Sequence, residues 1–214
     1  MKIFQISSTP VRVHWSLLAV IIGLMGWQYS VSGVPAMITV GLAAVCLFAT
    51  VFLHELAHVL VAKDFGYNTR SITLYPFGGV ARVEMPMDVP PRDELYIALA
   101  GPMVNAVLAL IFLPLAWFYG NPYGLLALLN FLMFAFNMLP SYPMDGGRVM
   151  RSLLARRWGH AKATKVAITV SRVFAWIYFA GGAYLGSPML VAIGAYLLYL
   201  LYYRIRREVD VSEN

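Results

Sequence analysis

The residues best suited to chemistry are two histidines and a glutamate inside an apolar stretch, residues 51–61. His54 and His58 are four positions apart, so on a helix they share a face and lie about 6 Å apart along the axis. This spacing allows two imidazoles to bind one zinc ion. Glu55 projects about 100° away from His54, which makes it a poor third ligand but lets it reach a water on the metal. Because such groups are costly to bury in hydrocarbon, the pattern favours a functional role.

The composition predicts a polytopic membrane protein. Of the 214 residues, 60% are hydrophobic and only 12% are charged, and the mean hydropathy is +0.70. The net charge of +6 does not favour nucleic acid as a partner, because the basic residues flank apolar segments instead of mixing with exposed aromatic residues. Cys46 is the only cysteine. It lies about 12 Å before His54 on the same predicted helix, so we interpret it as a core residue and not as a ligand.

We predict an α-helical protein with six transmembrane helices and a short membrane-associated β-ribbon between the second and third. The spans are expected at residues 14–30, 36–62, 94–119, 123–139, 163–185 and 188–203. Residues 66–92 are rich in β-forming side chains and are interrupted by Pro76, so they are expected to form the ribbon, either at the membrane interface or around a wet cavity. Residues 1–203 form the membrane core, and residues 204–214 form a polar C-terminal tail.

The first span has a second interpretation. Residues 1–13 carry two basic side chains and precede an apolar run, as in a secretory signal peptide, and Ser30 and Ser32 lie where a cleavage site would be. We favour a retained first transmembrane helix, because the hydrophobic pattern continues directly into the next predicted span.

The distribution of basic residues predicts the orientation in the membrane. Two Lys or Arg residues lie in the N-terminal segment, four in the 63–93 connection, six in the 140–165 connection and three in the C-terminal tail, while the alternate connections hold none. The positive-inside rule therefore places both termini and the ribbon in the cytoplasm, which requires an even number of spans. Arg172 is the exception, and we expect it to snorkel towards the headgroups.

A catalytic zinc commonly has three protein ligands, so His54 and His58 need one more. Asp64 stands at the third position of an extended zinc motif, but a valine replaces the glycine that would turn the chain back. His160 lies in a basic stretch typical of a protein surface. Asp145 lies in a proline-broken segment on the predicted cytoplasmic side, where a carboxylate is costly unless it is paired or metal-bound. Capping of the following helix is the alternative role for Asp145.

Two further motifs accompany the histidine pair. The three motifs are His54-Glu55-Leu-Ala-His58, then Ala100-Gly101-Pro102 with Asn105, then Asn137-Met-Leu-Pro140 followed by Pro143-Met-Asp145-Gly146-Gly147-Arg148. In this order, and over nearly the whole chain, they resemble the site-2 proteases, which are intramembrane zinc metalloproteases. The combination is specific, whereas the His-Glu motif alone is not.

The resemblance implies one zinc ion held by His54, His58 and Asp145, with Glu55 as the catalytic residue. It also implies hydrolysis of a peptide bond within or near the transmembrane segment of a single-span membrane protein. The protein is then expected to be a multi-pass protein of a prokaryotic cell membrane, acting within the lipid bilayer.

The resemblance extends to the substrate path. It implies that the segment around Gly78 and Gly79 lines this path, and that Asn105 and Asn137 lie near the site. We hypothesise that the ribbon edge pairs with the unwound substrate. Many prokaryotic members carry a PDZ domain or C-terminal nucleotide-sensing modules, which do not fit in this chain. A regulatory protein or a missing C-terminal module is therefore an expected partner.

Three other functions remain open from the sequence. A membrane metal transporter also places His and Asp within its spans, but it does not need Glu55 beside a ligand, and its ligands should follow a path across the bilayer. A zinc protease held in the membrane could instead act on soluble or lipidated peptides. A catalytically inactive scaffold would not require zinc.

Overall fold

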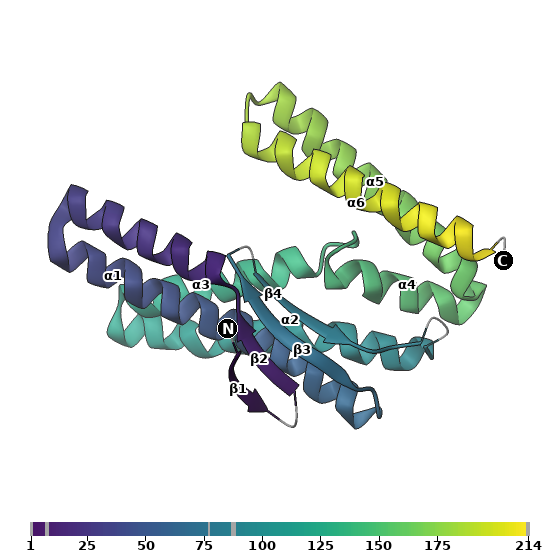
Figure 1. The fold of residues 1–214 in the computed structure, drawn as a ribbon, viewed down its shortest axis with the longest axis horizontal. Helices are drawn as coiled ribbons and strands as arrows, with labels where there is room; N and C mark the ends of the chain where they lie inside the picture. Colours follow the sequence, from purple (N-terminus) through teal and green to yellow (C-terminus); the bar gives the residue numbers. More distant parts are fainter. Residues whose placement is uncertain (1, 7–8, 77, 87–88, 213–214) are drawn as a thin grey trace. The chain divides into compact units, whose positions relative to one another are not determined.

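The computed structural model describes residues 2–6, 9–76, 78–86 and 89–212. Within them, four strands and six helices follow one another along the chain (Figure 1): β1 (Lys2–Ile6), β2 (Thr9–Val13), α1 (Trp15–Asp64), β3 (Thr69–Tyr75), β4 (Gly78–Val83), α2 (Pro91–Tyr119), α3 (Asn121–Asn137), α4 (Asp145–Trp158), α5 (His160–Tyr184) and α6 (Pro188–Ser212). The chain forms two compact units. The first unit comprises Met1–Val89 and Ala100–Phe134, and the second comprises Pro90–Leu99 and Ala135–Asn214.

Helix α1 is a helical hairpin. Its backbone leaves helical geometry at Gly33 (φ 77°, ψ −169°), a conformation that glycine adopts readily, and Pro35 follows in the next turn. The two arms lie side by side and antiparallel (Figure 1), and a Cβ added at Gly41 in the second arm would lie 3.0 Å from Met25 Cε in the first. The break falls between the segments predicted as the first two spans.

The helices are apolar enough for a membrane protein. Among the described residues, α1, α2 and α5 are each long and apolar enough to cross a membrane, by length and composition. Shorter apolar helical segments are Tyr123–Asn137 and Pro188–Tyr203. The prediction of a mostly helical protein with a small sheet is confirmed, whereas the number of six spans stays a prediction.

The predicted ribbon is part of a four-stranded sheet with the order β1-β2-β3-β4. β1 and β2 form an antiparallel hairpin, β2 pairs in parallel with β3, and β3 pairs antiparallel with β4. The N-terminal hairpin was not predicted, because residues 1–13 were interpreted as a basic segment that precedes the first membrane span. Val11 and Ile72 of the sheet share a buried cluster with Val59 of α1. This cluster fixes the rotation of the α1 arm that carries the two histidines.

In the second unit, α5 and α6 pack closely against each other (Figure 1). A Cβ added at Gly182 would lie 2.6 Å from Val191 N, and one at Gly194 would lie 2.4 Å from Phe179 N. Close backbone approach through glycine is typical of membrane helix pairs. The buried cluster of this unit includes Tyr142, so the segment before α4 packs on the same helices. The main-chain N–H of Tyr142 also donates to the hydroxyl of Ser171 at 2.8 Å.

Candidate metal centre

His54 and His58 lie one turn apart on the second arm of α1, and each is 5% exposed. Their Nε2 atoms face each other at 3.1 Å. Two nitrogen ligands of a tetrahedral zinc ion, at bond lengths of about 2.0–2.1 Å, lie about 3.3 Å apart. Two unprotonated ring nitrogens at such a distance repel each other unless a proton or a cation lies between them. The pair therefore has the geometry of two ligands of one metal ion.

Helix α2 leaves room beside this pair at Gly101. A Cβ added there would lie 2.3 Å from His58 Nε2 and 2.6 Å from His54 Nε2. Any side chain at this position would therefore displace the tips of the imidazoles. Glycine inside a helix is less favourable than alanine by about 1 kcal/mol, so the need for space is the physical reason for it here.

Hydrogen bonds from α2 and α3 orient the ring of His54. Its Nδ1 lies 2.5 Å from Asn105 Oδ1. Asn105 Nδ2 donates to Asn130 Oδ1 at 2.9 Å, and Asn130 Nδ2 donates to the main-chain oxygen of Leu126 at 2.9 Å. Both asparagine side chains are fully buried. With Nδ1 engaged by the amide, Nε2 is the ring nitrogen turned towards His58.

Glu55 is held by strand β4. Its Oε2 accepts a hydrogen bond from the main-chain N–H of Ala81 at 2.8 Å. A Cβ added at Gly79 would lie 2.4 Å from Glu55 Cγ and 3.0 Å from Oε1, so a side chain there would displace the carboxylate. The strand backbone thus fixes Glu55 next to the histidine pair. This placement suits a group that transfers protons.

Asp145 is the first residue of α4, in the second unit. The N-cap position belongs to Met144, so Asp145 does not occupy the capping position that was its alternative role. The chain before α4 folds tightly over this first turn. A Cβ added at Gly146 would lie 2.3 Å from the main-chain oxygen of Leu139, and one at Gly147 would lie 2.7 Å from Tyr142 N. The two glycines therefore hold the turn that presents Asp145.

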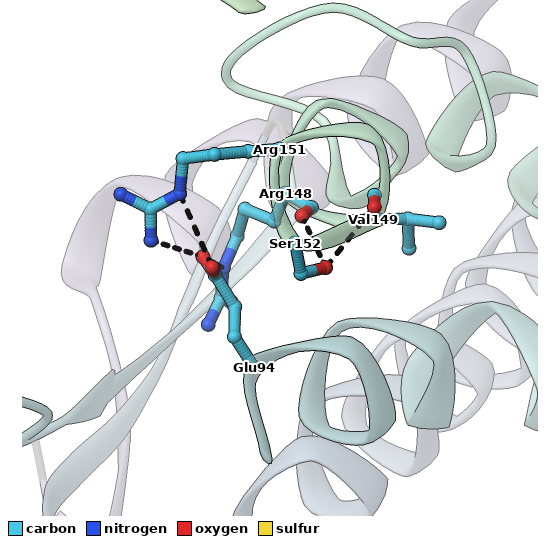
Figure 2. Close-up of polar contacts among 5 residues, drawn as sticks. All are labelled: Glu94, Arg148, Val149, Arg151 and Ser152. Carbon is cyan, nitrogen blue, oxygen red and sulfur yellow. Dashed lines mark hydrogen bonds and ion pairs between the residues drawn. The ribbon is translucent and has the colours of Figure 1, made fainter. Parts of the chain in front are cut away.

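A buried ion pair ties α4 to the first turns of α2 within the second unit (Figure 2). Glu94 is 1% exposed, and it accepts hydrogen bonds from Nε of Arg151 at 3.1 Å and from Nη2 of the same guanidinium. Arg148 Nε lies 3.9 Å from the same carboxylate. Bidentate arginine–carboxylate pairs are strong and directional. The pair therefore fixes the helix that begins with Asp145.

The candidate group of metal ligands among the described residues is His54 and His58 of the first unit with Asp145 of the second. Two imidazoles and a carboxylate are a donor set used by catalytic zinc. Asp64 and His160, the other two candidates, do not belong to this group. They are the last residue of α1 and the first of α5.

The other predicted site residues fall on different elements. Gly78 begins β4 with φ 133°, a backbone conformation that favours glycine. Asn137 is the last residue of α3. Asn105 contacts a histidine, a role that the sequence reasoning left open. That reasoning missed Asn130, although a polar residue in the middle of a predicted span is a recognisable signal. It also missed the main-chain contact of Ala81, for which the sequence carries no signal.

Comparison with known proteins decides the family. The profile described as peptidase family M50 matches residues 42–121 and 115–180. The chain belongs to peptidase family M50. The resemblance to the site-2 proteases is thereby confirmed.

Relatives and a solved structure support this assignment. The M50 chain is 33% identical over 207 residues to the zinc metalloprotease MJ0392 of Methanocaldococcus jannaschii, covering 92% of this chain and 58% of the relative. It is 28% identical over 145 residues to stage IV sporulation protein FB of Bacillus subtilis, covering 64% of this chain and 50% of the relative. It also resembles the solved structure of the site-2 protease from Methanocaldococcus jannaschii, with a TM-score of 0.70 and 28% identity over 95% of this chain and 94% of that chain.

The chain spans about half the length of the curated relatives that it matches. The prediction of zinc as the cofactor is confirmed by the family and by the relative named as a zinc metalloprotease.

Proposed function

We propose that this M50 protein is an intramembrane zinc metalloprotease that hydrolyses a peptide bond within or near the transmembrane segment of a membrane protein. The observation that carries the proposal is the pair of facing imidazoles of His54 and His58, with Glu55 held beside them by strand β4. Asp145 is the proposed third ligand. When bound, zinc supplies the Lewis acidity that activates a water for attack on the peptide carbonyl.

Glu55 is the group that moves protons in this mechanism. Its carboxylate takes a proton from the attacking water and later delivers it to the leaving nitrogen. The hydrogen bond from Ala81 N holds Oε2, so we assign the proton transfer to Oε1. The main-chain contact restricts the rotation of the carboxylate, which keeps it beside the metal ligands during both transfers.

The outer edge of β4 is the proposed binding place for the unwound substrate. β4 is the last strand of the sheet. The N–H of Glu84 donates to Asn68 O, on the β3 side, whereas that of Ala81 points to Glu55. Because N–H groups alternate along a strand, that of Val83 also points away from β3. An unwound substrate needs main-chain partners that lipid does not provide, and this edge supplies them beside Glu55.

Proline at position 83 tests this binding mode. Val83→Pro removes an outward N–H without removing a hydrogen bond to β3, a change that an edge strand tolerates. We expect cleavage to fall at least about tenfold while zinc affinity stays unchanged. Val83→Thr is the matched control, because it keeps the N–H and the β-branched shape. Full activity of Val83→Pro would rule out pairing at this edge.

We further propose six transmembrane spans with both termini in the cytoplasm, the two arms of α1 supplying the first two. The charge distribution supports this orientation, and so does the break at Gly33. Labelling of single cysteines introduced into a Cys46→Ser background tests it. Ser187→Cys should react with an impermeant reagent from outside intact cells, and Lys162→Cys should react only after the membrane is opened. The reverse pattern would overturn the orientation.

The protease function is tested with the full chain reconstituted in liposomes. A single-span substrate and a soluble peptide with the same cleavage sequence are compared, and the zinc content is measured in parallel. Cleavage of the spanning substrate, lost in Glu55→Gln with zinc retained, is the expected result. Equal cleavage of the soluble peptide would favour a membrane-held protease of soluble peptides. Zinc flux without cleavage would favour a transporter. A regulatory partner stays a prediction from the family resemblance.

A further inference from the structure

His54, Asn105, Asn130 and the main-chain oxygen of Leu126 form a chain of hydrogen bonds. The donor and acceptor roles along this chain are fixed at the Leu126 end. The main-chain oxygen of Leu126 can only accept, so the group of Asn130 that faces it at 2.9 Å must be Nδ2. The side-chain oxygen of Asn130 must then face Asn105. Because that oxygen is an acceptor, Asn105 presents Nδ2 to it, at 2.9 Å.

The donor and acceptor roles of Asn105 in turn determine which nitrogen of His54 carries the proton. With its Nδ2 turned to Asn130, Asn105 presents Oδ1 to His54 Nδ1 at 2.5 Å. An amide oxygen can only accept, so Nδ1 must carry the proton. In a neutral imidazole the lone pair then lies on Nε2, the nitrogen that faces His58 at 3.1 Å. Only an unprotonated nitrogen can bind a metal ion.

We propose that Asn130 is a positioning residue that sets the metal-binding tautomer of His54 through Asn105. This inference rests on the proposed zinc function. The relay lies entirely within the first unit and joins α3, α2 and the second arm of α1. Partners behind the metal ligands commonly fix ring orientation and tautomer in zinc sites.

Without Asn130, the amide of Asn105 loses the partner that fixes its orientation. The other acceptor near its Nδ2 is the sulfur of Met133 at 3.8 Å, which is a weak acceptor. The amide can then turn over and present N–H to His54 Nδ1. That arrangement places the ring proton on Nε2, where it competes with the metal. Both asparagines are fully buried in the wild type, so bulk solvent has no direct access to this amide.

Substitutions at both asparagines separate this role from simple packing. Asn130→Leu should raise the zinc Kd about 10–100-fold, measured by competition with a chromogenic chelator on the full chain in detergent. Asn105→Asp replaces the amide by a carboxylate, which can only accept and cannot be turned into a donor. In that background Asn130→Leu should change the Kd less than about threefold. If Asn130→Leu weakened zinc binding equally in the wild type and in Asn105→Asp, Asn130 would act only through packing, and the proposal would be overturned.

Thr50→Val is the matched control for these affinities. Thr50 is buried one turn before His54 on the same helix, and its hydroxyl donates to Leu47 O at 2.8 Å. This variant removes a buried hydrogen bond of similar length and the contact of the hydroxyl with Met133 Sδ at 3.7 Å, but it removes none of the hydrogen bonds that join Asn130, Asn105 and His54. Its zinc Kd should match that of the wild type. A loss as large as that of Asn130→Leu would count against the relay.

Nitrogen NMR of the histidine ring tests the tautomer in the wild type, so its main result does not depend on the folding of a variant. In the zinc-free wild type, His54 should show a protonated Nδ1 and an unprotonated Nε2, and Asn130→Leu should shift this balance. A wild-type ring with the proton on Nε2 would overturn the proposal. This readout does not depend on cleavage, so an inactive wild type with the expected tautomer would contradict the proposed protease function and leave the relay standing.

Discussion

Gly101→Ala places a methyl group between α2 and the histidine pair. The new Cβ would lie 2.3 Å from His58 Nε2 and 2.6 Å from His54 Nε2. An ordinary van der Waals separation is about 3.5 Å, so the ring tips must move by about 1 Å. Zinc sites keep their ligand distances within about 0.2 Å. The displacement is therefore several times larger than the metal site can accept.

We expect the zinc Kd of Gly101→Ala to rise at least about 100-fold, the upper end of the effects seen when a ligand's supporting partner is removed. The stability of the zinc-free fold should not decrease. Alanine is more favourable than glycine in a helix by about 1 kcal/mol, and Gly101 does not have the positive φ that would strain a side chain. The Tm of the zinc-free variant should thus be equal to that of the zinc-free wild type or higher.

Chelator competition on the purified chain measures the affinity, and thermal unfolding of the zinc-free protein measures the stability. Gly23→Ala is the matched control, because a Cβ added at this α1 position meets nothing within 4 Å. It should bind zinc as the wild type does. If Gly101→Ala bound zinc within about twofold of the wild type, the histidine nitrogens would not be the metal ligands that the geometry indicates.

Three further predictions follow from contacts that lie within one unit or the other. Gly79→Ala should keep zinc but lower cleavage at least about tenfold, because the new methyl group displaces the glutamate carboxylate while leaving the histidines in place. Gly146→Ala should weaken zinc binding by moving the first turn of α4, whereas Gly181→Ala, with nothing within 4 Å, should not. Arg151→Met should lower the free energy of unfolding by about 3 kcal/mol, because it leaves a buried carboxylate without its main partner; denaturant titration checks this, and Glu94→Leu in the same chain should recover most of the loss.

The metal-binding pair was predictable because its geometry is local. Two histidines four positions apart share a helix face whatever the rest of the chain does. The break near Gly33 was predictable for a similar reason, since glycine and proline end helices through their own backbone properties. The prolines before α4 and the two glycines in its first turn likewise indicated a break in the helix next to Asp145.

The supporting contacts were not predictable, because they join residues far apart in the chain. β2 pairs in parallel with β3, although all of α1 lies between them in the sequence. No local pattern in either strand indicates this pairing. The relay behind His54 needs α2 and α3 at the correct rotation, which the sequence alone does not fix. The reason for glycine at position 101 is the close approach of the two imidazoles, which the sequence alone does not reveal.

We propose above that the histidine pair and Glu55 hydrolyse a peptide bond inside the membrane. The most direct measurement is mass spectrometry of the products from a single-span substrate in liposomes, with wild type and Glu55→Gln compared at equal zinc content. We expect product ends within the spanning segment for the wild type and none for Glu55→Gln. Product ends outside the membrane, or undiminished cleavage by Glu55→Gln with zinc bound, would contradict it.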